Sequence, residues 1–162
     1  LAFHQGSALD LPFDDADFDG AYMLHVGMNV ADKPALFAEI SRVLRPGGTF
    51  GVFDVMRTGG GDLVYPVPWA AGAETSFLAS PADYRSALEA AGFEIVAERD
   101  RRDFALSFFA AIKANAAKAG GPPPLGLHIV MGADAPAKIA NMIANIEAGR
   151  IAPVEMVARR VN

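Results

Sequence analysis

The sequence predicts an α/β fold built on a mostly parallel sheet. Two segments that are mostly apolar, 18–26 and 49–55, are predicted to be strands with both faces covered. Between them, apolar side chains recur with the period of an amphipathic helix. A second helix, predicted to begin at Ser80, precedes another strand predicted at 93–100. Strands that alternate with helices in this way are typical of a parallel sheet.

The ends of these two helices are marked by residues that cap or stop helices. Asp32 is a predicted N-cap, and Pro46 with the two glycines after it is expected to end the first helix. The second helix is expected to begin at Ser80, with Pro81 in its first turn and Asp83 three residues after the cap. The first helix is expected to bury an apolar stripe of Leu36, Phe37, Ile40, Val43 and Leu44.

The remaining elements are expected from shorter patterns. In the first half of the chain these are a strand at 1–6, a loop at 8–18 and a long irregular loop at 57–79. A helix with Phe104, Phe108 and Ile112 follows and ends at 120–124, and the apolar segment 125–132 after it is ambiguous. Asp134 is expected to cap and Gly149 to stop a last helix with Ile139, Met142, Ile143 and Ile146, before a closing strand at 154–161. The apolar stripes of the two later helices are expected to be core or interface faces.

Composition excludes several classes of function. A chain of 162 residues can bury one substantial core, so we expect a single domain. With a net charge of -5 and no basic cluster, no nucleic acid is expected as a partner. No apolar run approaches the ~18 residues that span a bilayer, so no membrane is expected, and the absence of cysteine suits a reducing cytoplasm. The three histidines (His4, His25 and His128) are far apart in sequence, so we expect no metal site.

Three stretches carry a family resemblance. Together, "GSALDLPFDDADFDGAYMLHV" (6–26), "DKPALFAEISRVLRPGGTFGVFDV" (32–55) and "SPADYRSALEAAGF" (80–93) resemble the second half of class I S-adenosylmethionine-dependent methyltransferases, of the methyltransferase type 11 kind that includes ubiquinone-biosynthesis enzymes. The segment 25–48, followed by "YPVPWA" (65–70), is similar to a sarcosine/dimethylglycine methyltransferase-like subgroup. The resemblance implies a small-molecule methyltransferase that uses S-adenosylmethionine.

The resemblance also implies a Rossmann-like sheet that is mostly parallel, with an antiparallel last strand. Residues 1–162 would form the C-terminal part of one methyltransferase domain, with 57–79 as a lid-like loop and 101–150 as a helical insertion on the substrate side. The family's first strand and its glycine-rich loop have no counterpart here. The resemblance therefore implies that the N-terminal part of the domain, roughly another hundred residues, would lie ahead of Leu1.

Site residues follow from the same resemblance. The adenine of the cofactor would contact the loop 6–9, where Ser7 occupies a position that is often acidic in the family. His25 would line the site, either as a general base or only as a pocket wall. The cofactor-binding residues implied are Gly6, Ser7, Ala8, Leu9, Met23, Leu24 and His25. The substrate-binding residues implied are Met28, Asn29, Asp54, Tyr65, Trp69 and His128.

Two of these assignments have structural alternatives. Asp54 ends a buried strand, where a carboxylate needs partners, so it faces either the cleft or a backbone donor. The loop 57–79 contains Tyr65, Trp69 and Phe77, whose rings suit a cationic sulfonium or amine. Alternatively, these aromatic side chains bury into the core and the loop is an ordinary connection.

The expected reaction is direct in-line displacement of a methyl group, which requires no nucleophilic side chain. Two other functions stay open. A non-catalytic half-domain would associate through its unpaired sheet edge and form a homodimer. An NAD-dependent Rossmann enzyme is the other, although the "LRPGG" motif argues against it. The sequence does not identify the methyl acceptor.

Overall fold

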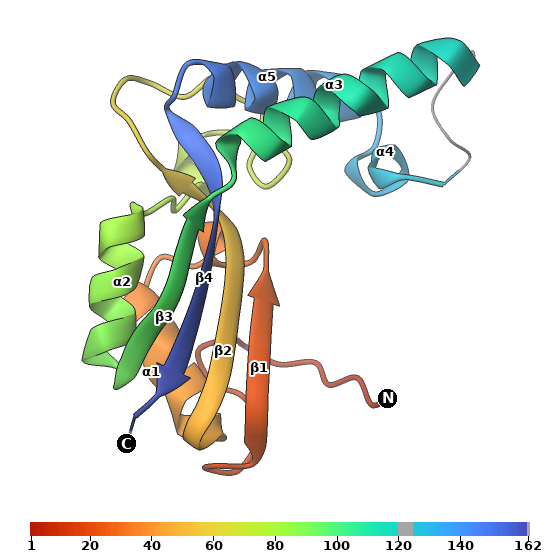
Figure 1. Ribbon diagram of the computed structural model, residues 1–162. Helices are drawn as coiled ribbons and strands as arrows, with labels where there is room; N and C mark the ends of the chain where they lie inside the picture. Colours follow the sequence, from red (N-terminus) through yellow and green to blue (C-terminus); the bar gives the residue numbers. More distant parts are fainter. Residues whose placement is uncertain (120–124, 162) are drawn as a thin grey trace.

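The computed structural model describes residues 1–119 and 125–161, and its centre is a four-stranded sheet of order β1-β2-β4-β3 (Figure 1). The strands are β1 (Phe18–Leu24), β2 (Leu44–Arg57), β3 (Phe93–Asp100) and β4 (Ile151–Arg160). β1 and β2 are parallel, whereas β4 lies between β2 and β3 and is antiparallel to both. The predicted sheet, with its antiparallel last strand, is confirmed.

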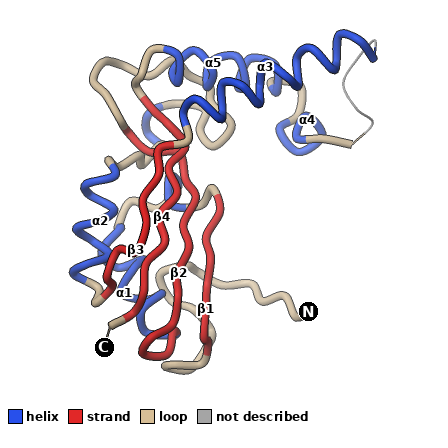
Figure 2. Tube along the Cα trace, viewed as in Figure 1, coloured by secondary structure: helices blue, strands red, loops and turns tan. Residues whose placement is uncertain are grey.

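The helices form two groups. α1 (Lys33–Val43) and α2 (Pro81–Ala90) cover one face of the sheet, as expected for crossovers between successive strands (Figures 1 and 2). α3 (Arg102–Ala119), α4 (Leu127–Met131) and α5 (Ala135–Glu147) form an arm beyond the carboxyl ends of β1, β2 and β3. Short 3₁₀ helices occupy Gly27–Asn29 and Ala73–Thr75. No helix in the described part of the chain is long and apolar enough to cross a bilayer.

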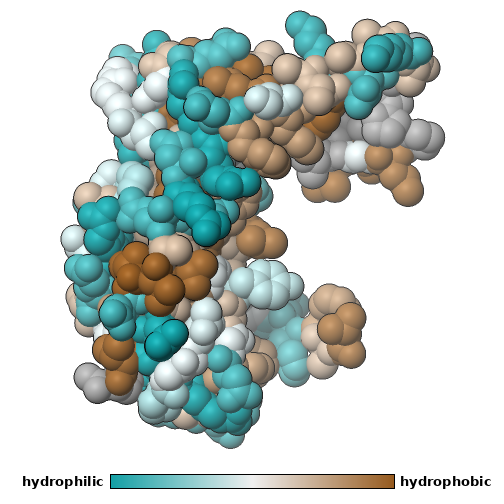
Figure 3. All heavy atoms as spheres, viewed as in Figure 1, coloured by the Kyte–Doolittle hydropathy of each residue, from teal (hydrophilic) through white to brown (hydrophobic). Residues whose placement is uncertain are grey.

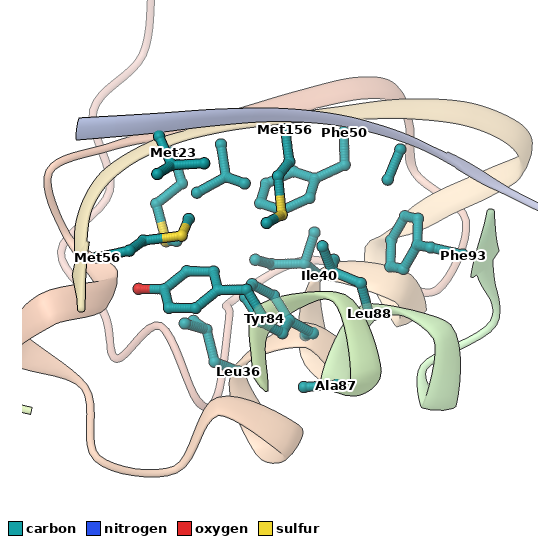
Figure 4. Close-up of a cluster of buried hydrophobic side chains, with 14 of the residues drawn as sticks. Met23, Leu36, Ile40, Phe50, Met56, Tyr84, Ala87, Leu88, Phe93 and Met156 are labelled. Atoms are coloured by element: carbon teal, nitrogen blue, oxygen red, sulfur yellow. The ribbon is translucent and has the colours of Figure 1, made fainter. Parts of the chain in front are cut away.

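A hydrophobic core fills the space between the sheet and the first pair of helices (Figure 4). Side chains on a strand alternate between its faces, so Phe50 and its alternate neighbours on β2 point toward α1 and α2. The ring of Phe37 packs 5.5 Å from that of Tyr84 and 6.1 Å from that of Phe50, measured between centroids. The core therefore holds α1 and α2 rigidly against β2.

The face of β1 that points away from α1 and α2 is open, and so is its outer edge. Tyr22 and Leu24 are 79% and 55% exposed, and among residues 1–119 and 125–161 no strand pairs with the outer edge of β1. The predicted strand at 1–6 is wrong. Residues 1–6 are exposed and have no regular structure. A strand needs a neighbour to accept its backbone hydrogen bonds, and this segment pairs with none of the four strands.

The Pro-Gly-Gly segment produces an outward bulge. Helix α1 ends at Val43, and Leu44 already pairs with β1, so β2 begins earlier than predicted. Residues 45–48 then leave the ladder before it resumes at Thr49. Gly47 has a φ of +81°, and a Cβ on Gly48 would lie 2.8 Å from the carbonyl oxygen of Arg45. Both glycines are thus required by the turn.

The later elements differ in part from their predictions. The ambiguous segment 125–132 contains α4, and β4 begins at Ile151 rather than at residue 154. On α3, the exposed fractions of Phe104, Phe108 and Ile112 are 57%, 50% and 46%, so this stripe is not core. The predicted helix stop at 120–124 lies outside the described residues.

The predicted cap of α2 is present as a reciprocal capping box between Ser80 and Asp83. We expect Ser80→Ala to lower the free energy of unfolding by about 1 kcal/mol, because the backbone N–H of Asp83 loses its acceptor. Ser86→Ala, at an exposed position of the same helix, should change it by less than about 0.5 kcal/mol. Urea denaturation of both variants tests this, and equal midpoints would contradict it.

Candidate functional site

The carboxyl ends of β1 and β2 lie side by side. The two strands are parallel, Leu24 pairs with Phe53 at the last rung between them, and β2 continues to Arg57. The next residue, His25, has a φ of +54°, a left-handed conformation that costs energy for a side chain other than glycine. Its N–H donates to the carbonyl of Phe53 at 2.8 Å, and its ring packs edge-on against the Phe53 ring with centroids 5.0 Å apart. Strain of this kind is common at functional sites.

The side chains at this tip face solvent. Leu24, His25 and Val26 are all exposed, so no bulky group covers the carboxyl end of β1. The molecule is hollowed between this region and the helical arm (Figure 3). Burial of part of the imidazole lowers the pKa of His25 below its ordinary value of 6.5, so the ring is neutral at pH 7.

Asp54 is fully buried just behind this tip. Its carboxylate accepts from the backbone N–H of Val26 at 2.9 Å, from that of Gly27 at 3.0 Å and from the hydroxyl of Tyr84 at 3.0 Å. Burial raises its pKa to about 6, while these hydrogen bonds and the nearby charge of Lys33 oppose the rise. Of the two alternatives, the backbone donors are the ones present. Asp54 exposes no surface that a substrate could touch, which corrects its assignment as a substrate contact.

Lys33 and Tyr84 complete a buried polar cluster around Asp54. Lys33 is 5% exposed, and its Nζ donates to the carbonyls of Val30 and Phe77, the latter at 2.8 Å. That nitrogen also lies 5.6 Å from the centroid of the Tyr84 ring. Burial lowers the pKa of Lys33 and raises that of Tyr84 above its ordinary value. The cluster contains one negative and one positive group, so neither charge is left uncompensated.

Sequence reasoning missed three residues of this region. Tyr84 lies four positions before Leu88 on the buried side of α2, a signal for burial that could have been used. Nothing near Lys33 or Gly27 in the sequence indicates their distant partners, Phe77 and Asp54, which lie 44 and 27 residues away.

Two predicted contacts turn away from the tip. Met23 is 7% exposed, and its side chain points into the core near Met56 (Figure 4), because it lies on the face of β1 opposite to Leu24. Met28 is 1% exposed and belongs to a second hydrophobic cluster with Val55. Their side chains are therefore structural in these positions, which corrects their assignment to cofactor and substrate. Asn29 is exposed.

The loop 57–79 is tied to the helical arm. Asn145 of α5 donates to the carbonyl of Val64 at 2.9 Å and accepts from its N–H at 3.0 Å. Trp69 donates through Nε1 to Ser76 at 3.0 Å and packs on the second cluster. Trp69 therefore packs as expected if the loop is an ordinary connection whose aromatic side chains are buried. Tyr65 is half-buried, and a lid role for the loop stays a prediction.

The remaining predicted residues lie elsewhere. The loop 6–9 precedes β1, with Ser7 and Leu9 exposed and Ala8 half-buried. Ser7 Oγ accepts from the N–H of Leu9 at 3.1 Å, which orders this loop. His128 is in α4, and its side chain is outside the described part of the structure. Within the described residues no cluster of histidine and acidic side chains could hold a metal.

Comparisons with known proteins agree with this arrangement. Residues 1–52 match the family described as a methyltransferase domain. An O-methyltransferase of Penicillium expansum is 35% identical over 107 residues, which are 62% of this chain and 37% of that protein. A demethylmenaquinone methyltransferase of Symbiobacterium thermophilum is 53% identical over 50 residues, which are 31% of this chain and 20% of that one.

Solved structures share the fold over nearly the whole chain. A putative sarcosine dimethylglycine methyltransferase from Galdieria sulphuraria has a TM-score of 0.74 at 23% identity, and the match covers 96% of this chain and 57% of that one. The [4+2]-cyclase SpnF has a TM-score of 0.64 at 25% identity, over 98% of this chain and 55% of that one.

The chain thus matches part of a class I S-adenosylmethionine-dependent methyltransferase domain, in sequence over residues 1–52 and in fold over nearly its whole length.

S-adenosylmethionine is the cofactor of this methyltransferase family, and a geranyl diphosphate methyltransferase with the same fold was solved in complex with it. The chain spans 37% or less of the two curated relatives named above and 57% or less of the solved neighbours. The match to SpnF shows that the methyltransferase fold also occurs in a protein named for a different reaction. The fold therefore does not identify the acceptor.

Proposed function

We propose that the protein transfers a methyl group from S-adenosylmethionine to a small-molecule acceptor, and that this chain supplies the wall at the carboxyl ends of β1 and β2. The observation that carries the proposal is the open carboxyl end of β1, which lies beside β2 with Leu24 and His25 exposed. Ligands of open α/β sheets bind at the carboxyl ends of parallel strands. The family match supplies the donor.

Under this proposal, the residues present would hold the part of the cofactor that the family resemblance assigns to them. Gly6, Ser7, Ala8 and Leu9 would contact the adenine, and Leu24 with His25 would lie beside the methionine. S-adenosylmethionine supplies an electrophilic methyl group when bound. The protein has to orient the acceptor and exclude water; in this proposal the exposed Asn29 would contact the acceptor, and the arm beyond the strand ends (Figure 1) would exclude water.

Calorimetry on the full-length protein tests the function. We expect S-adenosylmethionine and its demethylated product, S-adenosylhomocysteine, to bind, because the family match predicts both. A full-length protein that binds neither would contradict the proposal. This measurement needs no knowledge of the acceptor.

His25→Asn separates a pocket wall from a general base. Asparagine tolerates the left-handed backbone but cannot take up a proton at neutral pH. As a wall, His25 contributes contact alone, so we expect kcat/KM to fall about tenfold. A fall in kcat of about 10²–10⁴-fold would instead identify a base. His4→Asn, at an exposed histidine that also contacts an aromatic ring, is the matched control.

A second candidate function is association through the sheet edge without catalysis. It is favoured by β1, whose outer edge is unpaired within the described residues and whose open face exposes Tyr22 and Leu24. A homodimer formed in this way would be disrupted by Tyr22→Lys. Light scattering on the chain, with and without this substitution, tests it, and a monomer at all concentrations would exclude it.

A further inference from the structure

Hydrogen bonds and a short stretch of backbone together link the strand tip to the far end of the loop 57–79. Asp54 accepts from the N–H of Gly27, which begins the 3₁₀ helix Gly27–Asn29. The carbonyl of Met28, in that helix, accepts from the N–H of Phe77 at 2.8 Å. The carbonyl of Phe77 accepts from Lys33, whose charge also acts on Asp54. Both backbone groups of Phe77 are thereby fixed by the region around Asp54.

The groups at the Asp54 end of this series are shielded from water, whereas Phe77 at its other end is 40% exposed. Asp54 is 0% exposed, Met28 is 1% exposed and Lys33 is 5% exposed. Buried polar groups lose most when one partner is removed, since water cannot replace it. We therefore expect a change at Asp54 to weaken the later hydrogen bonds of the series as well as its own.

A carboxylate at position 54 serves a purpose that packing alone does not explain. Three successive backbone N–H groups after β1 are fixed, that of His25 by Phe53 and those of Val26 and Gly27 by the two oxygens of Asp54. These contacts hold the left-handed turn at His25 against its strain. An apolar side chain of similar size would fill the space but would accept neither bond.

We propose that Asp54 is a positioning residue, which acts through Gly27 and Met28 to set the loop that carries His25 and to tie it to the end of the segment 57–79. The inference rests on the proposed function for its kinetic consequence, but its structural consequence is independent of methyl transfer.

Amide hydrogen exchange in the full-length protein tests the inference with Asp54→Asn. Asparagine has one oxygen, so one of the two backbone N–H groups at Val26 and Gly27 loses its acceptor. We expect protection at Val26, Gly27 and Phe77 to fall about tenfold or more, while Met156 in the middle of β4 keeps its protection. Tyr84→Phe, which removes only one hydroxyl, is the milder variant if Asp54→Asn does not fold, and it should have the same effect on a smaller scale.

Two further variants make the result decisive. Val52→Ala alters the same strand two residues earlier at a position 2% exposed, and it has no polar partner, so it should lower protection throughout the sheet. Lys33→Met should loosen Phe77 while Val26 and Gly27 stay protected. The inference is overturned if Asp54→Asn affects Val26, Gly27 and Phe77 no more selectively than Val52→Ala does.

The kinetic measurement separates this inference from the proposed function. In an active full-length enzyme, Asp54→Asn should lower kcat/KM for the acceptor about tenfold. Loss of protection in a protein without methyltransferase activity would refute the proposed function but leave the positioning role standing. Unchanged protection in an active enzyme would refute the positioning role alone.

Discussion

Gly27→Ala is expected to lower the free energy of unfolding by about 3 kcal/mol or more. A Cβ at this position would overlap the carboxylate of Asp54 and the hydroxyl of Tyr84, and it would lie 3.1 Å from the terminal methyl of Met23. The carboxylate and the hydroxyl are buried and hydrogen-bonded to each other, so neither can move aside without losing a partner. The cost therefore combines steric overlap with a broken bond to a buried carboxylate.

Gly60→Ala is the matched control for this substitution. Gly60 is exposed, and a Cβ there would meet nothing within 4 Å. We expect its free energy of unfolding to stay within about 0.5 kcal/mol of the wild type. Urea denaturation monitored by circular dichroism measures both variants. If Gly27→Ala is no less stable than Gly60→Ala, the crowding around Asp54 is not as the structure has it.

Elements defined by local signals were predicted well from the sequence. The N-cap at Asp32 accepts from the N–H of Ala35 at 2.9 Å, and the box at Ser80 and Asp83 forms as expected. Caps and helical periodicity depend on residues within one or two turns, so a single sequence contains them. The same holds for β2 and β3, whose apolar character and flanking glycines are local.

Features that depend on distant partners were not predictable in this way. The segment 1–6 has strand-like composition, but pairing depends on a neighbour, which its own residues do not specify. The run 18–26 is apolar almost throughout, so its pattern does not reveal that Met23 faces the core and Leu24 the open side. The partners of Asp54 were left open for the same reason, since Gly27 and Tyr84 lie 27 and 30 residues away.

The titration of Asp54 provides the last prediction, which concerns stability against pH. Its ordinary pKa of 3.8 applies to the unfolded chain, and burial raises the folded value to about 6. Between these values the folded state binds the additional proton, so the contribution of Asp54 is fully present below the lower value and is lost as pH rises through the upper one. A shift of this size corresponds to about 3 kcal/mol.

Other groups titrate in or near this pH window. The free energy of unfolding of the wild type must therefore be compared with that of Asp54→Asn at each pH, because the wild-type curve alone combines several groups. Glu39 and Asp83 have lowered pKa values, and their contributions are lost only as pH falls below their ordinary range. His25 also has a lowered pKa, and its contribution is lost as pH falls below about 6.5, which opposes the effect of Asp54. The charge of Lys33 and the hydroxyl of Tyr84 both face the carboxylate and are retained in the variant.

Relative to Asp54→Asn, the wild type should therefore lose about 3 kcal/mol of its free energy of unfolding between about pH 4 and about pH 7. Asparagine keeps the shape and one acceptor but has no proton to release, so contributions from His25, Glu39 and Asp83 cancel in the difference. Urea denaturation of both proteins at several pH values measures it. Two curves that stay parallel over this range would mean that the carboxylate is not held in a low-dielectric site, and the charged cluster behind the strand tip would have to be more hydrated than its burial implies.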